Sequence, residues 1–192
     1  MQQLSKKLHI LWFRFSITYY HMRVLYSFIL LLCTNAVMSQ SPFPLNSVHG
    51  TTKAPLEIHV KNELNEKSYL SAHMPKGKIY LVSVWATWCG PCRAELRAIQ
   101  KVHCDWSEKY DFEFLAISID APTHRSKIFD MVNKTDWNFK VLHDEYGYLV
   151  KELDISNIPR MFLVDQQGNI VYEPHGYSSS VLKKIEKKVE SL

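Results

Sequence analysis

The sequence predicts an α/β protein in which helices flank a central mixed β-sheet. Two runs, residues 79–85 and 113–119, are rich in β-branched and aromatic side chains and are typical of buried strands. Apolar residues at helical spacing follow each run, and residues 178–192 form an amphipathic pattern with lysines on one side. Strands that alternate with helices in this way favour a layered α/β fold.

The N-terminal region predicts export. Residues 24–37 are mostly apolar but too short to span a bilayer comfortably, which takes about 20 residues. Arg23 precedes this run, and Val37 and Ser39 suit a signal-peptidase site, so we expect residues 1–39 to be a signal peptide. Cleavage after Ala36 and an uncleaved N-terminal anchor are the alternatives, and Met22 would make a more usual start.

Charge and length fit one exported domain. The predicted leader holds four of the 23 basic residues and none of the 19 acidic ones, so residues 40–192 have equal numbers of each. This balance gives no indication of nucleic-acid binding. Residues 40–54 read as a linker or arm, and residues 55–192 are long enough for a single domain with its own core.

The remaining elements follow in chain order. Residues 56–60 alternate like a strand, and residues 64–74 fit either a hairpin arm or a short helix. Helical spacing continues without a break over residues 93–109. Further helices are expected at residues 123–134, 146–153 and 178–192, and further strands at 138–143, 161–164 and 170–172.

The segment Trp88-Cys89-Gly90-Pro91-Cys92 carries the chemistry. It lies between the predicted strand 79–85 and the predicted helix, and Pro91 suits a first helical turn. Cys89 should therefore lie at the helix N-terminus, where free N–H groups favour a thiolate, with Cys92 one turn further on the same face. Redox chemistry is the favoured interpretation, with Cys89 attacking and Cys92 resolving; half of a zinc site is the alternative.

Four blocks resemble the thioredoxin superfamily, and more narrowly its extracytoplasmic TlpA/ResA-type branch. They are residues 84–96 with WCGPC and a Glu three positions after the second Cys, residues 114–120, residues 157–165 and residues 168–171. The resemblance covers residue 78 to the C-terminus. It implies a thioredoxin-like fold with an insertion after the second core strand, to which the helix at 123–134 would belong.

The resemblance also implies roles for individual residues. Pro159 would follow a cis peptide bond beside the cysteines, and the Ile158 backbone would pair with an extended substrate. Glu95 would carry protons near the buried thiol, with a solvated Glu paired to Arg93 or Arg97 as the alternative. Trp88, Gly90 and Pro91 would surround the site, and Arg160 would favour the Cys89 thiolate if it reached the site.

Two departures from the pattern matter. The branch usually has a proline where this chain has Arg97, so we expect the motif helix to be straighter. Cys104 leaves an odd thiol in the exported part, too far along the helix to join the cysteine pair.

The predicted function is a thiol–disulfide oxidoreductase that reduces exported proteins, in cytochrome c maturation or general periplasmic redox homeostasis. Its substrates would be protein disulfides, a membrane electron donor of the thiol-reducing type would restore the dithiol, and the protein would be a periplasmic monomer. No cofactor beyond the redox-active disulfide and no metal is expected. A copper-handling protein or a disulfide oxidase or isomerase is the alternative; a peroxidase is disfavoured because WCGPC does not supply a peroxidatic setting.

Overall fold

The computed structural model describes residues 52–174, 176 and 178–192. The predicted signal peptide, the start at Met22 and most of the predicted arm at 40–54 lie outside the described residues. The end of that arm is structured: strand β1 (Thr52–Lys53) pairs antiparallel with strand β8 (Asn169–Tyr172), and Thr52 lies opposite Ile170. The Ala54 N–H donates to the Gly168 carbonyl at 3.0 Å and continues this pairing, so the last residues of the predicted arm contact the sheet.

The centre of the described sheet is strand β4 (Ile79–Trp85), which is buried along its whole length. It pairs parallel with β5 (Phe112–Ser118) and antiparallel with β7 (Arg160–Val164). Strand β6 (Lys140–His143) then pairs parallel with β5. The predicted mixed sheet is confirmed. With β2 (His59–Lys61) and β3 (Lys67–Tyr69), the strands of the described residues stand in the order β1-β8-β7-β4-β5-β6-β2-β3.

Short strands finish the sheet at both sides. Strand β8 (Asn169–Tyr172) and β1 lie beyond β7, whereas β2 (His59–Lys61) and β3 (Lys67–Tyr69) lie beyond β6. Strand β2 is shorter than the predicted strand at 56–60. The ambiguous segment 64–74 contains both alternatives, because β3 runs directly into the 3₁₀ helix η1 (Leu70–Ala72).

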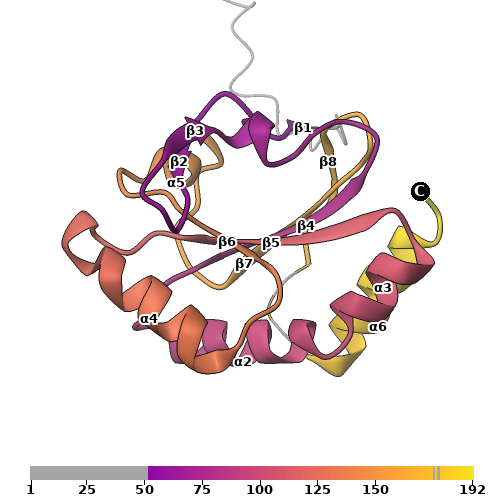
Figure 1. The fold of residues 1–192 in the computed structure, drawn as a ribbon. Helices are drawn as coiled ribbons and strands as arrows, with labels where there is room; N and C mark the ends of the chain where they lie inside the picture. Colours follow the sequence, from indigo (N-terminus) through magenta and orange to yellow (C-terminus); the bar gives the residue numbers. More distant parts are fainter. Residues whose placement is uncertain (1–51, 175, 177) are drawn as a thin grey trace, which may run out of the picture. The chain divides into compact units, whose positions relative to one another are not determined.

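The helices lie on the two faces of this sheet, as Figure 1 shows. One face carries the four longer helices, and the other carries α5 (Tyr148–Glu152). The β2–β3 hairpin, at the margin of the sheet, packs against the same cluster as α5. The longer helices are α2 (Gly90–Gln100), α3 (His103–Lys109), α4 (Arg125–Thr135) and α6 (Ser179–Val189), with the 3₁₀ helix η2 (Pro122–His124) leading into α4.

The predicted single helix over residues 93–109 is wrong. It is divided into α2 and α3, although no proline stands at Arg97. The N–H groups of Lys101 and Val102 bond to carbonyls three residues back, which tightens the last turn of α2 and ends it. The turn lets Trp106 of α3 pack edge-on against Phe112 of β5, with ring centroids 5.5 Å apart. Tertiary packing therefore breaks a helix that local spacing would continue.

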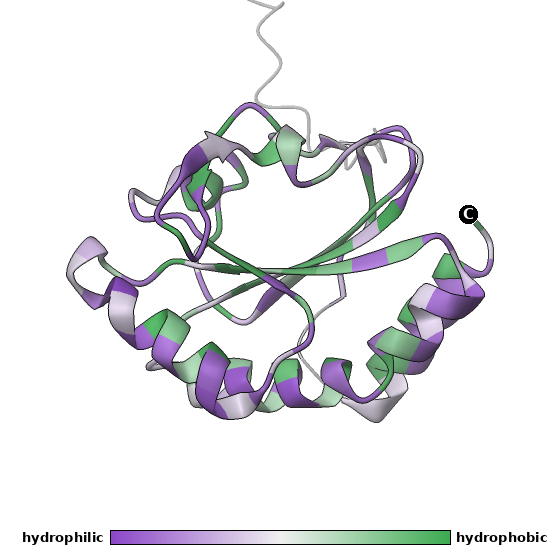
Figure 2. Ribbon diagram, in the orientation of Figure 1, coloured by the Kyte–Doolittle hydropathy of each residue, from purple (hydrophilic) through white to green (hydrophobic). Residues whose placement is uncertain are grey.

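Alternation along β4 divides the core into two clusters. Leu81 and Trp85 face the cluster beneath α2, α3, α4 and α6, whereas Tyr80, Val82 and Val84 face the cluster beneath α5 and the hairpin. Figure 2 shows the corresponding pattern, with hydrophobic colour toward the sheet and hydrophilic colour outside. Among residues 52–174, 176 and 178–192, no helix has the length and apolar character to cross a membrane.

Candidate active site

Cys89 is the N-cap of helix α2, as the sequence predicts. Its backbone is extended, the helix begins at Gly90, and Pro91 occupies the first turn, where a missing N–H costs nothing. The Cys92 N–H donates to the Cys89 sulfur at 3.2 Å. The sulfur of Cys89 therefore lies where the free N–H groups and the helix dipole stabilise negative charge.

The two cysteines form a disulfide, with their Cα atoms 5.3 Å apart. Cys92 is wholly buried and Cys89 is 6% exposed, whereas the neighbouring Trp88 is 67% exposed. Cys89 is thus the sulfur nearer to solvent, which fits the predicted order of attack and resolution. Among the described residues, no group of three or more His, Cys, Asp and Glu side chains could hold a metal ion.

Glu95 lies one turn beyond Cys92 on α2 and is only 1% exposed. The Ser83 hydroxyl of β4 donates to its carboxylate at 2.7 Å. Burial raises the pKa of Glu95 from 4.5 to about 7, and the Ser83 hydrogen bond opposes this shift. The alternative of a solvated Glu95 is therefore wrong, and the buried carboxyl can exchange protons near neutral pH.

The loop before β7 lies beside the carboxyl end of β4. The Ile158–Pro159 peptide bond is cis, and the next residue, Arg160, is paired with Val84 in the β4–β7 ladder. The WCGPC segment follows the same end of β4. The fold therefore brings the Pro159 loop and the cysteine motif together at the carboxyl end of this central strand. Ile158 is half-buried and packs against both hydrophobic clusters.

Arg160 is engaged elsewhere. Its guanidinium forms an ion pair with Glu173, just after β8, and lies over the Phe162 ring, 5.8 Å from its centroid. Phe162 belongs to the cluster on the sheet face opposite α2, and Arg160, two residues earlier, points to that same face. The structure therefore places this charge with Glu173 rather than in a contact with the cysteines.

The sequence interpretation missed a buried polar group that holds the motif loop. Asp120, two residues after the end of β5, accepts hydrogen bonds from the Thr87 N–H at 2.8 Å and the Thr87 hydroxyl at 2.7 Å. Ser118 donates to the same carboxylate, and His143 Nε2 lies 2.7 Å from the Asp120 carbonyl, so that nitrogen must carry the proton. The sequence contained a signal for this contact, because Thr87 and Asp120 are polar residues that follow the predicted strands 79–85 and 113–119.

The fold and the cysteine pair define a thioredoxin-like protein. Residues 51–173 match the AhpC/TSA family over more than half of the chain, and the chain belongs to this family. A solution structure of a thioredoxin-like protein from Porphyromonas gingivalis is 33% identical, with a TM-score of 0.64. The similarity covers 73% of this chain and 93% of that protein.

Curated relatives are similar over a shorter stretch. "Thiol-disulfide oxidoreductase ResA" of Bacillus cereus is 31% identical over 101 residues, which is 53% of this chain and 57% of the relative. "Thiol:disulfide interchange protein DsbE" of Yersinia pestis is 32% identical over 111 residues, 57% of this chain and 55% of the relative. The chain thus spans about half the length of these relatives.

Proposed function

We propose that this protein is a thiol–disulfide oxidoreductase that reduces disulfides in exported proteins. The observation that carries the proposal is the Cys89–Cys92 disulfide at the start of α2, with the buried Glu95 carboxyl on the same helix. The relatives named thiol-disulfide oxidoreductase ResA and thiol:disulfide interchange protein DsbE support thiol–disulfide exchange as the reaction.

The reaction transfers two electrons from the dithiol to a substrate disulfide. The Cys89 thiolate attacks one substrate sulfur, a mixed disulfide forms, and the other substrate sulfur leaves as a thiolate. The Cys92 thiolate then attacks the Cys89 sulfur and releases the second substrate thiolate, which leaves the Cys89–Cys92 disulfide. Each released thiolate takes up a proton.

Glu95 would handle the proton of the buried Cys92. The two residues are three positions apart on α2 and therefore share one helix face. A buried thiol must lose its proton before it can attack, and a carboxyl with a pKa of about 7 can accept it. Ser83 keeps this carboxyl on the side of the sheet that faces α2.

The cellular setting remains part of the proposal. A membrane electron donor of the thiol-reducing type would restore the dithiol in the periplasm, and cytochrome c maturation or general redox homeostasis would supply the substrates. The exported location depends on the leader predicted at residues 1–39 and on the extracytoplasmic branch that the sequence resembles.

The reduction potential of the Cys89–Cys92 couple tests the direction of electron flow. We expect a value near that of thioredoxin, about −270 mV, in defined thiol buffers. A value near that of a strong periplasmic oxidant, about −120 mV, would instead indicate a disulfide oxidase at the same site.

Trapping tests the order of attack. Cys92→Ser should accumulate a mixed disulfide with a substrate peptide, because the resolving thiol is gone, whereas Cys89→Ser should accumulate none. Cys104 is exposed, and its sulfur accepts a hydrogen bond from the Asn138 side chain at 3.1 Å, so Cys104→Ser is the matched control for adventitious adducts. An adduct on Cys104 alone would contradict the assignment.

A further inference from the structure

A groove of about 490 Å³ lies directly beside the cysteine motif. Thr87 and Trp88, which precede Cys89, form one wall, and helix α4 forms the other. This helix belongs to the segment that the sequence interpretation assigned to an insertion, and no step of the proposed reaction uses it. The residues of α4 that line the groove are Lys127, Asp130, Met131, Lys134 and Thr135.

Both walls are held in place by the rest of the fold. Thr87 is fixed to the buried Asp120 carboxylate by two hydrogen bonds. At the start of α4, the Arg125 guanidinium donates to the backbone carbonyls of Asn62 and Glu63. At its end, the Gln100 side chain of α2 donates to the Asp136 carbonyl at 3.0 Å. The groove therefore exists before anything binds, which lowers the cost of ordering on binding.

The apolar part of the groove lies next to the reactive cysteine. The Trp88 ring is 67% exposed, and Met131 is half-buried on the facing helix. A large exposed aromatic residue and a flexible thioether suit an apolar side chain of varied shape. Because Trp88 is the neighbour of Cys89, such a side chain would belong to the molecule whose disulfide Cys89 attacks.

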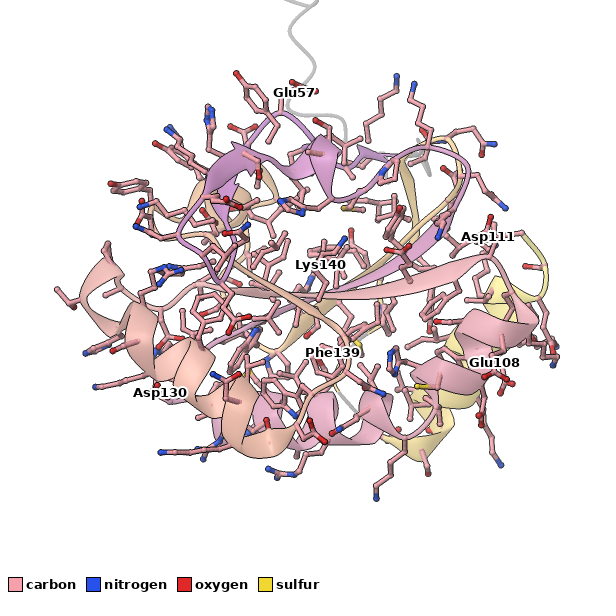
Figure 3. The ribbon with its side chains drawn as sticks, in the orientation of Figure 1. Glu57, Glu108, Asp111, Asp130, Phe139 and Lys140 are labelled. Carbon is pink, nitrogen blue, oxygen red and sulfur yellow. A yellow bond between two sulfur atoms is a disulfide. The ribbon has the colours of Figure 1, made fainter. Side chains whose placement is uncertain are left out.

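The polar part of the groove is positive. Lys127 and Lys134 are exposed and stand two turns apart on α4, roughly 10 Å along the helix axis. Asp130, which Figure 3 labels on α4, lies between them in the sequence. Within the part of the chain that the structure describes, no ion pair joins Asp130 to either lysine, so both ammonium groups remain available to an acidic partner.

We propose that this groove binds the polypeptide segment next to the substrate's disulfide, and that it selects segments with an apolar residue flanked by acidic ones. An extended segment advances about 3.3 Å per residue, so carboxylates about three positions apart would match the spacing of Lys127 and Lys134. The apolar side chain between them would enter the space between Trp88 and Met131. The proposal rests on the proposed function, since it names the substrates of that same site.

Binding without chemistry separates the groove from the redox reaction. The probes are two fluorescein-labelled peptides without cysteine that share a central Leu. The acidic peptide has Asp on both sides of this Leu, and the basic peptide has Lys at the same positions. Each peptide is titrated with the full chain, and fluorescence anisotropy measures binding. We expect the acidic peptide to bind at least threefold tighter than the basic one, and the preference to weaken in 0.5 M salt. Lys127→Glu with Lys134→Glu should abolish or reverse the preference.

A matched control carries the same charge change elsewhere. Lys183 and Lys184 are exposed on α6, outside the groove, so Lys183→Glu with Lys184→Glu should keep the acidic preference. Circular dichroism of both double variants verifies the fold. Equal binding of the two peptides to the unmodified protein, or equal loss of preference in both double variants, would overturn the proposal.

Reduction of the matching disulfide peptides gives the second measurement. The ratio of the rate constants for acidic and basic peptides should follow the binding preference in each variant, and this ratio is independent of any general change in activity. If the protein binds the acidic peptide selectively but reduces neither peptide, the proposed function fails and the groove stands. If it reduces both peptides at equal rates in every variant, the groove is not a substrate site.

Discussion

Replacing Glu95 with Gln tests how much the ionised carboxyl destabilises the fold. Burial raises the pKa of Glu95 from 4.5 to about 7 in the folded protein, while the unfolded chain keeps the ordinary value. Between pH 4.5 and 7 the folded state therefore binds a proton that the unfolded state has lost. The free energy of unfolding must fall as the pH rises through this window, and the contribution is fully present only below pH 4.5.

The size of the effect follows from the shift. A change from 4.5 to about 7, at about 1.4 kcal/mol per pKa unit, corresponds to roughly 3 kcal/mol. Gln has nearly the shape of Glu, does not titrate, and can accept the Ser83 hydrogen bond. Glu95→Gln should therefore match the unmodified protein at pH 4.5 and exceed its free energy of unfolding by about 3 kcal/mol at pH 8.

Urea unfolding of the oxidised full chain at pH 4.5 and pH 8 measures this difference, because the Cys89–Cys92 pair cannot titrate while it is a disulfide. Glu108→Gln, at an exposed position of α3, controls for the loss of a surface carboxylate. A stability difference between Glu95→Gln and the unmodified protein that is the same at both pH values would refute the reasoning.

Three further substitutions test the site and the core. Ser83→Ala should raise the pKa of Glu95 above its value of about 7, because the ionised carboxylate loses a hydrogen bond. The carboxyl carbon shift of Glu95, followed by NMR against pH, measures this pKa, and an unchanged midpoint would contradict the role of Ser83. Asp120→Asn should lower the free energy of unfolding by about 3 kcal/mol, because an amide cannot accept all three hydrogen bonds that the carboxylate accepts. Denaturant unfolding measures this loss, with Asp105→Asn at an exposed position of α3 as the control. Equal losses in the two variants would contradict the role of Asp120. Ile99→Ala should lower the free energy of unfolding by about 2–5 kcal/mol in the same assay, because this side chain of α2 is wholly buried in the core. A loss under about 1 kcal/mol would mean that the core closes over the gap.

Local sequence signals were sufficient for the centre of the active site. The apolar run of β4, the proline in the first turn and the cysteine spacing placed Cys89 at the start of α2, and the structure agrees. These signals act within a few residues, so a single sequence contains them. The cis bond before Pro159 is different, because only the family resemblance indicated it.

Contacts between distant residues were not predictable in the same way. The bond between Thr87 and Asp120 joins residues 33 positions apart, and it depends on β4 and β5 being neighbours in the sheet. The end of α2 likewise depends on Trp106 meeting Phe112. The groove beside Trp88 appears only once α4 is packed over the sheet, since helical periodicity shows which side of a helix is polar but not what that side meets.

The short outer strands limit how this sheet can meet other chains. Strand β1 has two residues and β3 has three, so within residues 52–174, 176 and 178–192 neither edge presents a long row of unpaired N–H and C=O groups. Lysines stand on both edge strands, at Lys53 and Lys67, and lysine on an edge disfavours the addition of another strand. An extended segment of another chain therefore finds little at these two margins on which to start an aggregate.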